Sequence, residues 1–325
     1  MKIAVLGAGA WGTALASHAM AQHPVSLWSR NAAVVADINR NHRNSRYLPD
    51  IDLPPTLVAT GQLSQAIDGA GLLVIGTSVA GLRPVMQAIV GSGHGAVIWL
   101  CKGLAADTGA LAHDVVAGVA PDWHAGCLSG PSFAQEVALG LPVALTAAAT
   151  SDELASRMVD AFHHGAMRVY RSQDLRGVEI AAALKNVMAV ATGISDGLGL
   201  GSNARAALLT RGLAEMTRFG LAHGAQAETF MGLAGVGDLV LTCTGDLSRN
   251  RTVGLKLAQG LALDEILRQL GHVAEGVACC RAVVAKAHET GVEMPVSEAV
   301  LAVIEADITP AAAVASLLAR EPKAE

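Results

Sequence analysis

Residues 2–12 read KIAVLGAGAWG, and this stretch decides the fold of the first half of the chain. An apolar run at residues 3–6 comes directly before glycines at positions 7, 9 and 12, and a helical stretch follows. A strand, a Gly-x-Gly-x-x-Gly turn and a helix in this order form the dinucleotide-binding fingerprint. We assign Gly7 to the tight turn, Gly9 to the close approach of a pyrophosphate and Gly12 to packing of the helix, whose N-terminus faces the negative charge.

Two other interpretations of the same stretch are less favoured. A glycine-rich turn without a ligand does not need a strand before it and a helix after it. Lys2, followed by small and apolar residues, also resembles the start of a secretory signal peptide. The glycine spacing explains the run better.

Composition excludes several classes of protein. The 325 residues are 52% apolar and 16% charged, with a net charge of −5 and a pI near 6.1. These values exclude a disordered chain and argue against a nucleic-acid-binding surface. The apolar runs at 72–82 and 137–149 are too short, or too interrupted by glycine, to cross a bilayer. We therefore expect no membrane insertion and no nucleic-acid partner.

The cysteines show neither a CxxC metal pattern nor a disulfide framework, since they are five in number and irregularly spaced. We expect reduced, mostly buried thiols in a cytoplasmic protein that binds no metal, with a catalytic thiol as the less favoured alternative. The residues concerned are Cys101, Cys127, Cys243, Cys279 and Cys280.

The order of elements predicts an α/β chain. Short β-rich runs alternate with helical stretches through the first half, which implies a parallel sheet with crossover helices. The expected strands cover residues 3–6, 25–28, 72–75, 97–101, 143–146 and 167–170. After about Leu175 the segments become long, rich in Ala and Leu, and helical in period. Helices are expected at 178–191, 204–223, 249–259, 277–290 and 297–305.

We therefore predict a Rossmann-type parallel-sheet domain over residues 1–174 and an all-α domain over residues 175–325. This arrangement resembles that of 6-phosphogluconate dehydrogenase-like folds. No flexible linker separates the halves, so we expect the helix that includes Val178 to pass from one domain into the other.

Arg30 stands where NAD-specific domains usually carry a carboxylate for the ribose hydroxyl, because the second strand ends in LWSRN. A guanidinium pairs with a 2′-phosphate, which favours binding of NADPH at least as strongly as NADH. A solvated turn arginine is the alternative, and Asn31 could serve NAD instead. The preference between the two cofactors stays open.

Lys185 is the most informative residue of the second half, since it lies inside the apolar stretch IAAALKNVMAVA. A lysine in this position either extends its ammonium to the surface or faces a cleft. Desolvation lowers the affinity of an amine for its proton, which suits it to proton exchange with a carbonyl oxygen during hydride transfer. Asn186 beside it carries an amide that can bind substrate hydroxyls, or simply lies on the helix surface.

A second polar cluster lies at residues 232–251, which read GLAGVGDLVLTCTGDLSRNR. Asp238 can orient the ammonium of Lys185. Ser248, Arg249 and Asn250 open a helical stretch, so backbone N–H groups, the helix dipole and a guanidinium can converge on a phosphate. The alternative is an N-capped helix with a solvated arginine.

These motifs resemble the bacterial type of NAD(P)-dependent glycerol-3-phosphate dehydrogenases over essentially the whole chain. The matching stretches are GAGAWGTALA, NSRYLP, CKGL, SGPSFAQEVALGLP, GVEIAAALKNVMAVATGISDGLGLGSNARAALLTRGLAEM, TFMGLAGVGDLVLTC, SRNR and VAEG. Departures are modest: Thr77 and Ser78 replace a more usual Pro-Ser-like pair, and Ser202 stands where Asp or Ala is common.

The resemblance implies a role for each matching residue. Lys185 is the implied general acid/base, with Asp238 as its catalytic partner, and Lys102 of CKGL lies near both nicotinamide and substrate. The implied substrate-binding residues are Lys102, Gly130, Ser132, Lys185, Asn186, Asp238, Ser248, Arg249 and Asn250. The implied cofactor-binding residues are Gly7, Gly9, Ala10, Trp11, Gly12, Arg30, Lys102, Ala134, Arg249, Val273 and Glu275.

Several of these assignments keep an alternative. Ser132 with Gln135 also fits a helix capping box, and Trp11 fits core packing. Lys102 taken alone fits a solvated lysine at a strand end. Val273 and Glu275 carry little signal apart from the resemblance.

The resemblance further implies the reversible reduction of dihydroxyacetone phosphate to sn-glycerol 3-phosphate by NAD(P)H, which supplies glycerophospholipid synthesis. It implies a homodimer with its active site in the cleft between the domains. One rival function is that of a two-domain 3-hydroxyacid or ketopantoate-type dehydrogenase. A non-catalytic dinucleotide sensor is the other, although a sensor has no chemical reason to carry Lys102, Lys185, Asn186 and Asp238 together.

Overall fold

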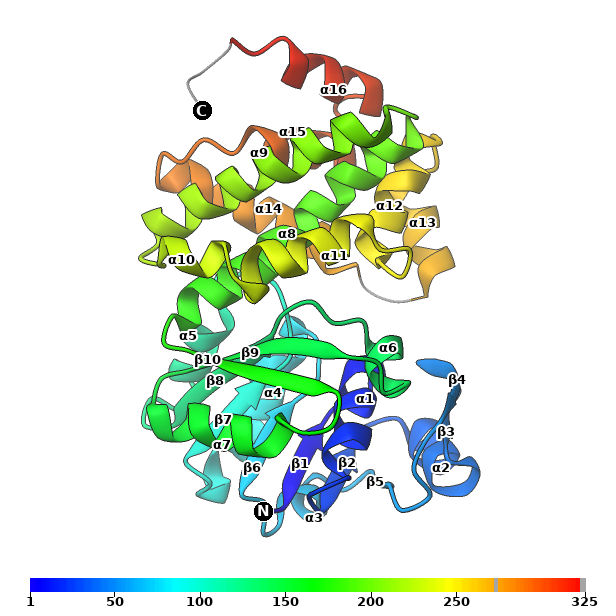
Figure 1. Ribbon diagram of the computed structural model, residues 1–325, viewed down its shortest axis with the longest axis vertical. Coiled ribbons are helices and arrows are strands. Elements are labelled where there is room, and N and C mark those ends of the chain that lie inside the picture. Colours follow the sequence, from blue (N-terminus) through cyan, green and yellow to red (C-terminus); the bar gives the residue numbers. More distant parts are fainter. Residues whose placement is uncertain (272–273, 322–325) are drawn as a thin grey trace. The chain divides into compact units, whose positions relative to one another are not determined.

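The structure, a computed structural model, describes residues 1–271 and 274–321 and forms two compact units (Figure 1). The first unit comprises Met1–Lys102 and Ala112–Val178, and the second comprises Gly103–Leu111 and Glu179–Glu325. The two units divide between Val178 and Glu179, within the first turn of a long helix. The functional domain boundary predicted between residues 174 and 175 stays a prediction. The loop at 103–111 belongs to the second unit because Leu104 and Leu111 pack in the core of that unit.

An eight-stranded sheet forms the centre of the first unit, in the order β10-β9-β8-β7-β6-β1-β2-β5 (Figure 1). Every neighbouring pair in it is parallel except β8 with β9, so the prediction of a parallel-dominated sheet is confirmed. Its strands are β1 (Ile3–Leu6), β2 (Val25–Trp28), β5 (Val58–Thr60), β6 (Leu72–Ile75), β7 (Ala96–Trp99), β8 (His124–Ser129), β9 (Val143–Ala149) and β10 (Met167–Ser172).

Strands β8 and β5 were not predicted from the sequence. The β8 sequence, HAGCLS, contains no β-branched or aromatic residue, so it carries none of the usual strand signal. It becomes a strand because β7 and β9 pair with it on both sides. The short edge strand β5 pairs with β2 alone and exposes Val58.

Helices cover both faces of the sheet, and its inner strands are therefore buried on both sides. All four residues of β1 and of β6 are buried, as expected for parallel strands that lie between helical layers. A separate antiparallel hairpin, β3 (Arg43–Asn44) with β4 (Leu48–Asp52), follows the second helix. The helices are α1 (Ala10–Ala19), α2 (Ala32–Asn41), α3 (Leu63–Ile67), α4 (Val79–Ile89) with a 3-10 turn at Val90–Ser92, α5 (Ala112–Ala117), α6 (Ala134–Ala138) and α7 (Asp152–Phe162).

The described part of the second unit is helical, as predicted (Figure 1). The helices are α8 (Leu175–Gly197), which begins in the first unit, α9 (Gly201–Ala222), α10 (Ala227–Phe230), a π-helical turn at Leu233–Gly237, α11 (Asp238–Thr244), α12 (Arg249–Ala258), α13 (Leu263–Leu270), α14 (Glu275–Glu289), α15 (Pro295–Ile304) and α16 (Pro310–Leu318). All five predicted helices are present, with ends shifted by a few residues.

Helix α8 has the length and apolar composition of a membrane-spanning segment, although no such segment was predicted from the sequence. Its most apolar 18-residue window has a mean hydropathy of 1.3 and is 100% buried within the structure. Complete burial is typical of the central helix of a helical core. The bent pair Ala227–Thr244 and Arg249–Ala258 passes the same test only if it is counted as one span.

Glycines allow α8 and α12 to pack backbone against backbone. A Cβ on Gly254 would lie 2.1 Å from the Val190 carbonyl oxygen, and a Cβ on Gly193 would lie 2.1 Å from the Arg251 carbonyl oxygen. An ion pair supports the same crossing, because Arg251 of α12 donates from Nε to Asp196 of α8 over 2.8 Å. Near the same crossing, Asn186 of α8 contacts Asn250 at the start of α12.

A buried carboxylate, Glu215 of α9, holds the N-terminus of α15. It is 1% exposed and accepts hydrogen bonds from the backbone N–H groups of Val296 and Ser297 and from the Ser297 hydroxyl. These bonds satisfy helix donors that have no partner within the helix. Burial nevertheless raises the pKa of Glu215 to about 7, and the three hydrogen bonds only partly oppose that shift.

We predict that the free energy of unfolding falls as pH rises from about 4.5 to about 7. In that window the unfolded Glu215 is ionised while the folded one keeps its proton, so unfolding releases a proton and a higher pH favours it. Glu215→Gln should flatten this dependence, as measured by denaturant unfolding at several pH values. Glu289→Gln, which alters an exposed carboxylate at the end of α14, should leave the dependence unchanged. A wild-type slope that survives in Glu215→Gln would contradict the assignment.

Candidate functional site

The predicted cofactor-binding residues of the first unit follow the carboxyl ends of neighbouring strands. Gly7 follows β1, Arg30 lies just beyond β2, Lys102 lies beyond β7 and Gly130 follows β8. These strands and β6 run parallel in the order β2-β1-β6-β7-β8, so their carboxyl ends lie at one edge of the sheet. The chain leaves β1 toward β2 on one side and returns as β6 on the other, and ligands of such sheets bind at this switch point.

The glycine loop has the shape that a pyrophosphate needs. Gly7 has φ +134°, and a Cβ there would lie 2.7 Å from the Gly76 carbonyl. A Cβ on Gly12 would lie 2.0 Å from the Gly7 oxygen, so α1 packs directly on the loop. Gly9 differs, because its Cβ would meet only the Gly76 oxygen at 3.9 Å. The space beside Gly9 is therefore open to a ligand.

The N-terminus of α1 begins at this open side. Gly9 is its N-cap residue and makes no side-chain cap, so the first N–H groups of α1 keep their capacity for an anion. Ala10 and Trp11, at the start of α1, are half-buried and pack against the core of the unit. Part of the Trp11 side chain is therefore buried against the core, and the rest of its surface is accessible. These residues fit a bound dinucleotide.

Arg30 is exposed, and its side chain makes no hydrogen bond or ion pair with any other residue in the described ranges 1–271 and 274–321. Asn31 is the N-cap of α2 and accepts hydrogen bonds from the N–H groups of Ala33 and Val34. Its amide oxygen is thus already used within the fold. The interpretation of Asn31 as a ribose-binding residue loses support, whereas Arg30 remains available.

Lys102, Gly130 and Ser132 lie together at the same edge. The Lys102 ammonium donates to the Gly130 carbonyl oxygen over 3.3 Å, and the Ser132 hydroxyl donates to the same oxygen over 3.1 Å. The alternative of a capping box at Ser132 is wrong, because the N-cap of α6 is Phe133 and it makes no side-chain cap. Ala134 is the first residue of α6 and packs against the core of the first unit.

In the second unit, Lys185 of α8 contacts Asp238 of α11, as the sequence suggested. The Lys185 Nζ donates to Asp238 Oδ1 over 2.5 Å and to the Thr242 hydroxyl over 2.8 Å. Lys185 is 5% exposed and Asp238 is 1% exposed. The Thr242 hydroxyl donates to the Asp238 backbone oxygen over 2.7 Å, so its lone pair is free to face the ammonium. These contacts orient the lysine firmly.

The glycine-rich turn before Asp238 is a π-helical turn, Leu233–Gly237. A Cβ on Gly235 would lie 2.1 Å from the Phe230 backbone oxygen, so only glycine allows the turn to close. The turn leads directly into α11 and places Asp238 in its first turn. Such π-turns often occur at functional sites.

A second polar chain connects three helices of this unit. Asn186 Oδ1 accepts from Asn250 Nδ2 over 3.0 Å, and Asn250 Oδ1 accepts from the Gly276 N–H over 3.0 Å. Asn186 Nδ2 also donates to Glu275 Oε2 at 3.5 Å. A Cβ on Gly276 would lie 2.4 Å from the Asn186 carbonyl oxygen, so α14 lies directly on α8. Asn186, Asn250 and Glu275 thus belong to one network.

The start of α12 confirms the cap and leaves an exposed guanidinium. The Ser248 hydroxyl accepts from the Arg251 N–H at 3.3 Å, and Ser248 is 4% exposed. Arg249 is exposed and makes no side-chain hydrogen bond or ion pair within the described part of the chain. A helix N-terminus with a nearby guanidinium can bind a phosphate. Val273 lies outside the described residues.

Neither the role of Thr242 nor the ion pair of Asp196 with Arg251 was predicted from the sequence. The signal for Thr242 was present, because it follows Asp238 by four residues and therefore shares its helix face. Asp196 gave no such signal, since its partners are Arg205 and Arg251 from two other helices.

The five cysteines are all free thiols. None forms a disulfide, and all except the half-buried Cys101 are buried, as expected. Burial raises the pKa of the Cys243 thiol to about 12, so that sulfur is not a nucleophile at neutral pH. No cluster of three or more potential metal ligands occurs among residues 1–271 and 274–321.

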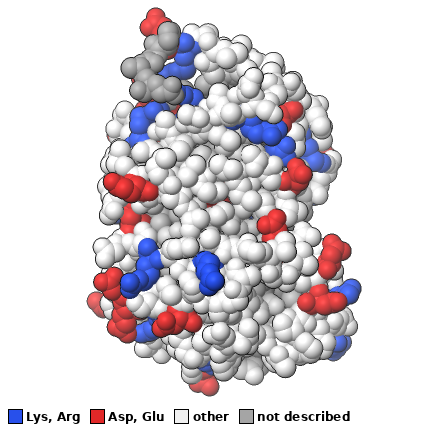
Figure 2. Space-filling view, in the orientation of Figure 1, with Lys and Arg blue, Asp and Glu red and all other residues white. Residues whose placement is uncertain are grey.

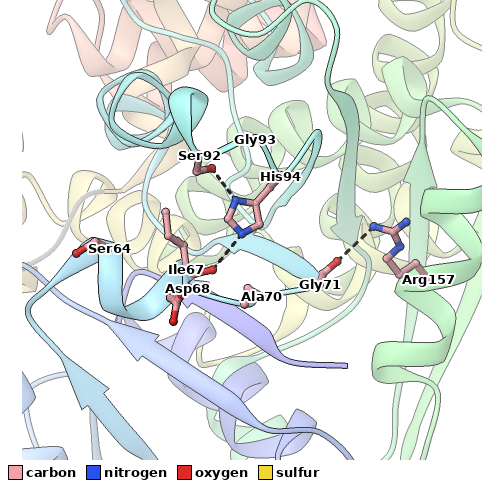
Figure 3. Close-up of a pocket in the computed structure, with 10 residues that line it drawn as sticks. Ser64, Ile67, Asp68, Ala70, Gly71, Ser92, Gly93, His94 and Arg157 are labelled. Atoms are coloured by element: carbon pink, nitrogen blue, oxygen red, sulfur yellow. Dashed lines mark hydrogen bonds between the residues drawn. The ribbon is translucent and has the colours of Figure 1, made fainter.

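A shallow pocket of about 590 Å³ lies elsewhere on the first unit (Figure 3). Gly71 and His94 line it just before β6 and β7, so it lies at the amino ends of the strands, at the opposite edge from the glycine loop. His94 is bonded to the Ile67 carbonyl oxygen and to the Ser92 hydroxyl, and Arg157 donates to the Gly71 carbonyl oxygen (Figure 3). None of the predicted site residues lines it.

The charged side chains on the face in Figure 2 are scattered, and both signs occur. No continuous basic patch is visible on that face, which agrees with the low charge content of the chain. Any anion site on it therefore depends on a few local groups.

Comparisons with known proteins agree with this geometry. Residues 2–155 match the family description of the NAD-dependent glycerol-3-phosphate dehydrogenase N-terminus, and residues 174–315 match that of its C-terminus. A glycerol-3-phosphate dehydrogenase (NAD(P)+) of Ralstonia nicotianae is 57% identical, and the match covers 100% of this chain and 99% of the relative.

Solved structures give the same result. The crystal structure of glycerol-3-phosphate dehydrogenase from Coxiella burnetii has a TM-score of 0.94 and 40% identity, and the match covers 98% of this chain and 99% of that one. A ketopantoate reductase of the PanE/ApbA family from Ralstonia eutropha shares only the fold, with a TM-score of 0.59 and 16% identity over 94% of this chain and 98% of that one. This chain therefore belongs to the family of NAD(P)-dependent glycerol-3-phosphate dehydrogenases.

Proposed function

We propose that this chain catalyses the reversible reduction of dihydroxyacetone phosphate to sn-glycerol 3-phosphate with NAD(P)H. The observation that carries the proposal is the buried contact of Lys185 with Asp238 and Thr242. It occurs in the same unit as the exposed Arg249 at the N-terminus of α12. Lys185 suits proton transfer to a ketone oxygen, and Arg249 suits binding of a phosphate.

Lys185 acts as the general acid in reduction and as the general base in oxidation. Bound NAD(P)H supplies the hydride. As the ketone becomes an alcohol its oxygen gains negative charge, and the Lys185 ammonium donates a proton to that oxygen. Asp238 and Thr242 hold the Nζ of Lys185 in one position, which keeps the proton aimed at the substrate.

The amide network and the start of α12 bind the rest of the substrate. Asn186 and Asn250 present amides that suit hydroxyl groups, and their bonds to each other and to Gly276 fix their orientation. Ser248, Arg249 and the N–H groups of α12 bind the phosphate. Lys102, Gly130 and Ser132 contribute further contacts, as implied by the family resemblance.

The first unit binds the dinucleotide through its glycine loop, with the pyrophosphate at the N-terminus of α1. Arg30 pairs with the 2′-phosphate of NADPH, which makes NADPH at least as good a cofactor as NADH. By resemblance, Trp11, Ala134, Val273 and Glu275 add contacts to the cofactor. The resemblance also supports a cytoplasmic homodimer that supplies sn-glycerol 3-phosphate for phospholipid synthesis.

The test is the absorbance decay of NADPH and of NADH with dihydroxyacetone phosphate or ketopantoate as the acceptor. Rapid oxidation with dihydroxyacetone phosphate alone supports the proposal. Oxidation with ketopantoate alone would assign the chain to the ketopantoate-type reaction. If the cofactor binds tightly but neither acceptor oxidises it, the proposed reaction is wrong, the fold stands and the substrate is unknown.

We predict that Lys185→Ala and Lys185→Arg both lower turnover by about 100- to 10,000-fold, because neither side chain can exchange a proton at neutral pH. Stopped-flow or steady-state oxidation of NADPH measures the loss, and NADPH affinity should change little. Lys185→Arg keeps a cation beside Asp238, so it controls for the destabilising effect of an unpaired buried carboxylate.

Lys256→Ala is the matched lysine control, since Lys256 contacts Gln269 at the surface of the same unit. Its turnover should equal that of the wild type. Wild-type turnover in a folded Lys185→Arg variant would remove Lys185 from proton transfer.

We predict that Arg30→Asp weakens NADPH binding far more than NADH binding, because a carboxylate repels the 2′-phosphate that the guanidinium attracts. Calorimetric titration of each cofactor gives the two dissociation constants. Arg40→Asp, which makes the same charge change at an exposed position of α2, should leave their ratio nearly unchanged. Equal losses of NADPH and NADH binding in Arg30→Asp would show that Arg30 does not contact the 2′-phosphate.

A further inference from the structure

Asn44, on the hairpin β3–β4, contacts the glycine loop although it lies outside the dinucleotide fingerprint. Its side chain is fully buried, and Nδ2 donates to the Ala8 carbonyl oxygen over 3.0 Å and to the Thr13 hydroxyl over 2.9 Å. Ala8 stands between the first two fingerprint glycines, and Thr13 belongs to the first turns of α1. One side chain therefore joins the loop to the helix.

The bond to Ala8 determines which way the next N–H points. In a trans peptide the C=O and the following N–H point in opposite directions across a rigid plane. Because Asn44 holds the Ala8 oxygen, the Gly9 N–H is directed away from Asn44. Gly9 is the loop residue whose Cβ position is open, with its nearest neighbour at 3.9 Å. The hydrogen bond from Asn44 to the Ala8 oxygen thus orients the Gly9 N–H, which is the amide that approaches a pyrophosphate.

Burial of Asn44 is not explained by stability alone. Its Oδ1 is buried and has no hydrogen-bond partner among the described residues. A buried oxygen without a partner costs free energy, so an apolar side chain of similar shape would suit a purely structural position. Asparagine instead supplies two N–H donors at this position. One donates to the loop and the other to α1.

Two contacts hold the residues on either side of Asn44. The Ser45 N–H donates to the Asp37 carboxylate over 2.8 Å, which joins the hairpin to α2. Arg43 forms an ion pair with Asp52 across the hairpin at 2.7 Å. The hairpin thus presents Asn44 from a fixed support rather than from a loose loop.

We propose that Asn44 is a positioning residue for the cofactor, which orients the Ala8–Gly9 peptide so that its N–H binds the pyrophosphate. The inference rests on the dinucleotide-binding part of the proposed function and is independent of the substrate. Because NADH and NADPH share the pyrophosphate, loss of this orientation weakens both by the same factor. This separates Asn44 from Arg30, which acts on the 2′-phosphate alone.

The test compares Asn44→Ala and Asn44→Asp with Asn39→Ala and Asn39→Asp. Asn39 is the control for loss of an asparagine elsewhere in the same unit. It is exposed, but its side chain also makes two hydrogen bonds, to the Ala59 N–H and carbonyl oxygen, and it joins α2 to β5 and not to the loop. Titration calorimetry gives the dissociation constants of NADPH and NADH, and a thermal scan gives Tm. We expect both constants to rise about tenfold in the Asn44 variants and less than twofold in the Asn39 variants.

A second pair of variants tests the bond from the side of α1, in case the Asn44 variants do not fold. Thr13→Ser keeps the hydroxyl that accepts from Asn44, whereas Thr13→Val removes it. We expect Thr13→Ser to bind both cofactors like the wild type and Thr13→Val to bind both more weakly by an equal factor. Indistinguishable affinities in these two variants would overturn the proposal.

The outcomes separate this inference from its premises. If the wild type binds neither NADPH nor NADH, the proposed function fails before Asn44 is tested. If the wild type binds them and the folded Asn44 variants bind equally well, the positioning role fails alone. Weakened binding that follows the loss of Tm equally in the Asn44 and Asn39 variants would also overturn the proposal, because it would reflect stability only.

Discussion

Both units depend on backbone surfaces that meet without a side chain between them. In the first unit, Gly12 allows α1 to lie against the Gly7 carbonyl oxygen, where a Cβ would be 2.0 Å away. In the second unit, Gly254 and Gly276 bring α12 and α14 against carbonyl groups of α8. Close approach of this kind restricts the distance between elements, because hard backbone atoms leave little room for them to shift. The polar groups of the candidate site are carried on these elements.

Two buried carboxylates of the second unit show how the environment decides their chemistry. Asp238 faces the ammonium of Lys185 over 2.5 Å. Glu215 faces neutral N–H and O–H donors at the start of α15, and burial raises its pKa to about 7. A buried charge is tolerated where an opposite charge meets it, and otherwise it tends to take up a proton. The first arrangement suits proton transfer and the second makes stability depend on pH.

Much of the fold was predictable because its signals are local. Strands β1, β2 and β6 have the predicted bounds, since each is a short apolar run between turn residues. Strand β8 was missed because HAGCLS has no local strand preference and becomes a strand only by pairing with β7 and β9. The site followed the same rule: the sequence suggested Lys185 with Asp238, and the structure added Thr242 to that pair.

The sequence by itself determined the elements, the glycine loop and the residue types available for proton transfer and anion binding, because spacing along the chain carries that information. Only the tertiary structure decided which of these groups meet. Asn44 and Ala8 are far apart in sequence, as are Asn186 and Asn250, and each pair forms a buried hydrogen bond. Such contacts depend on which strands and helices pack against one another. No local sequence pattern specifies that choice, because it is made by packing between elements that are distant in the chain.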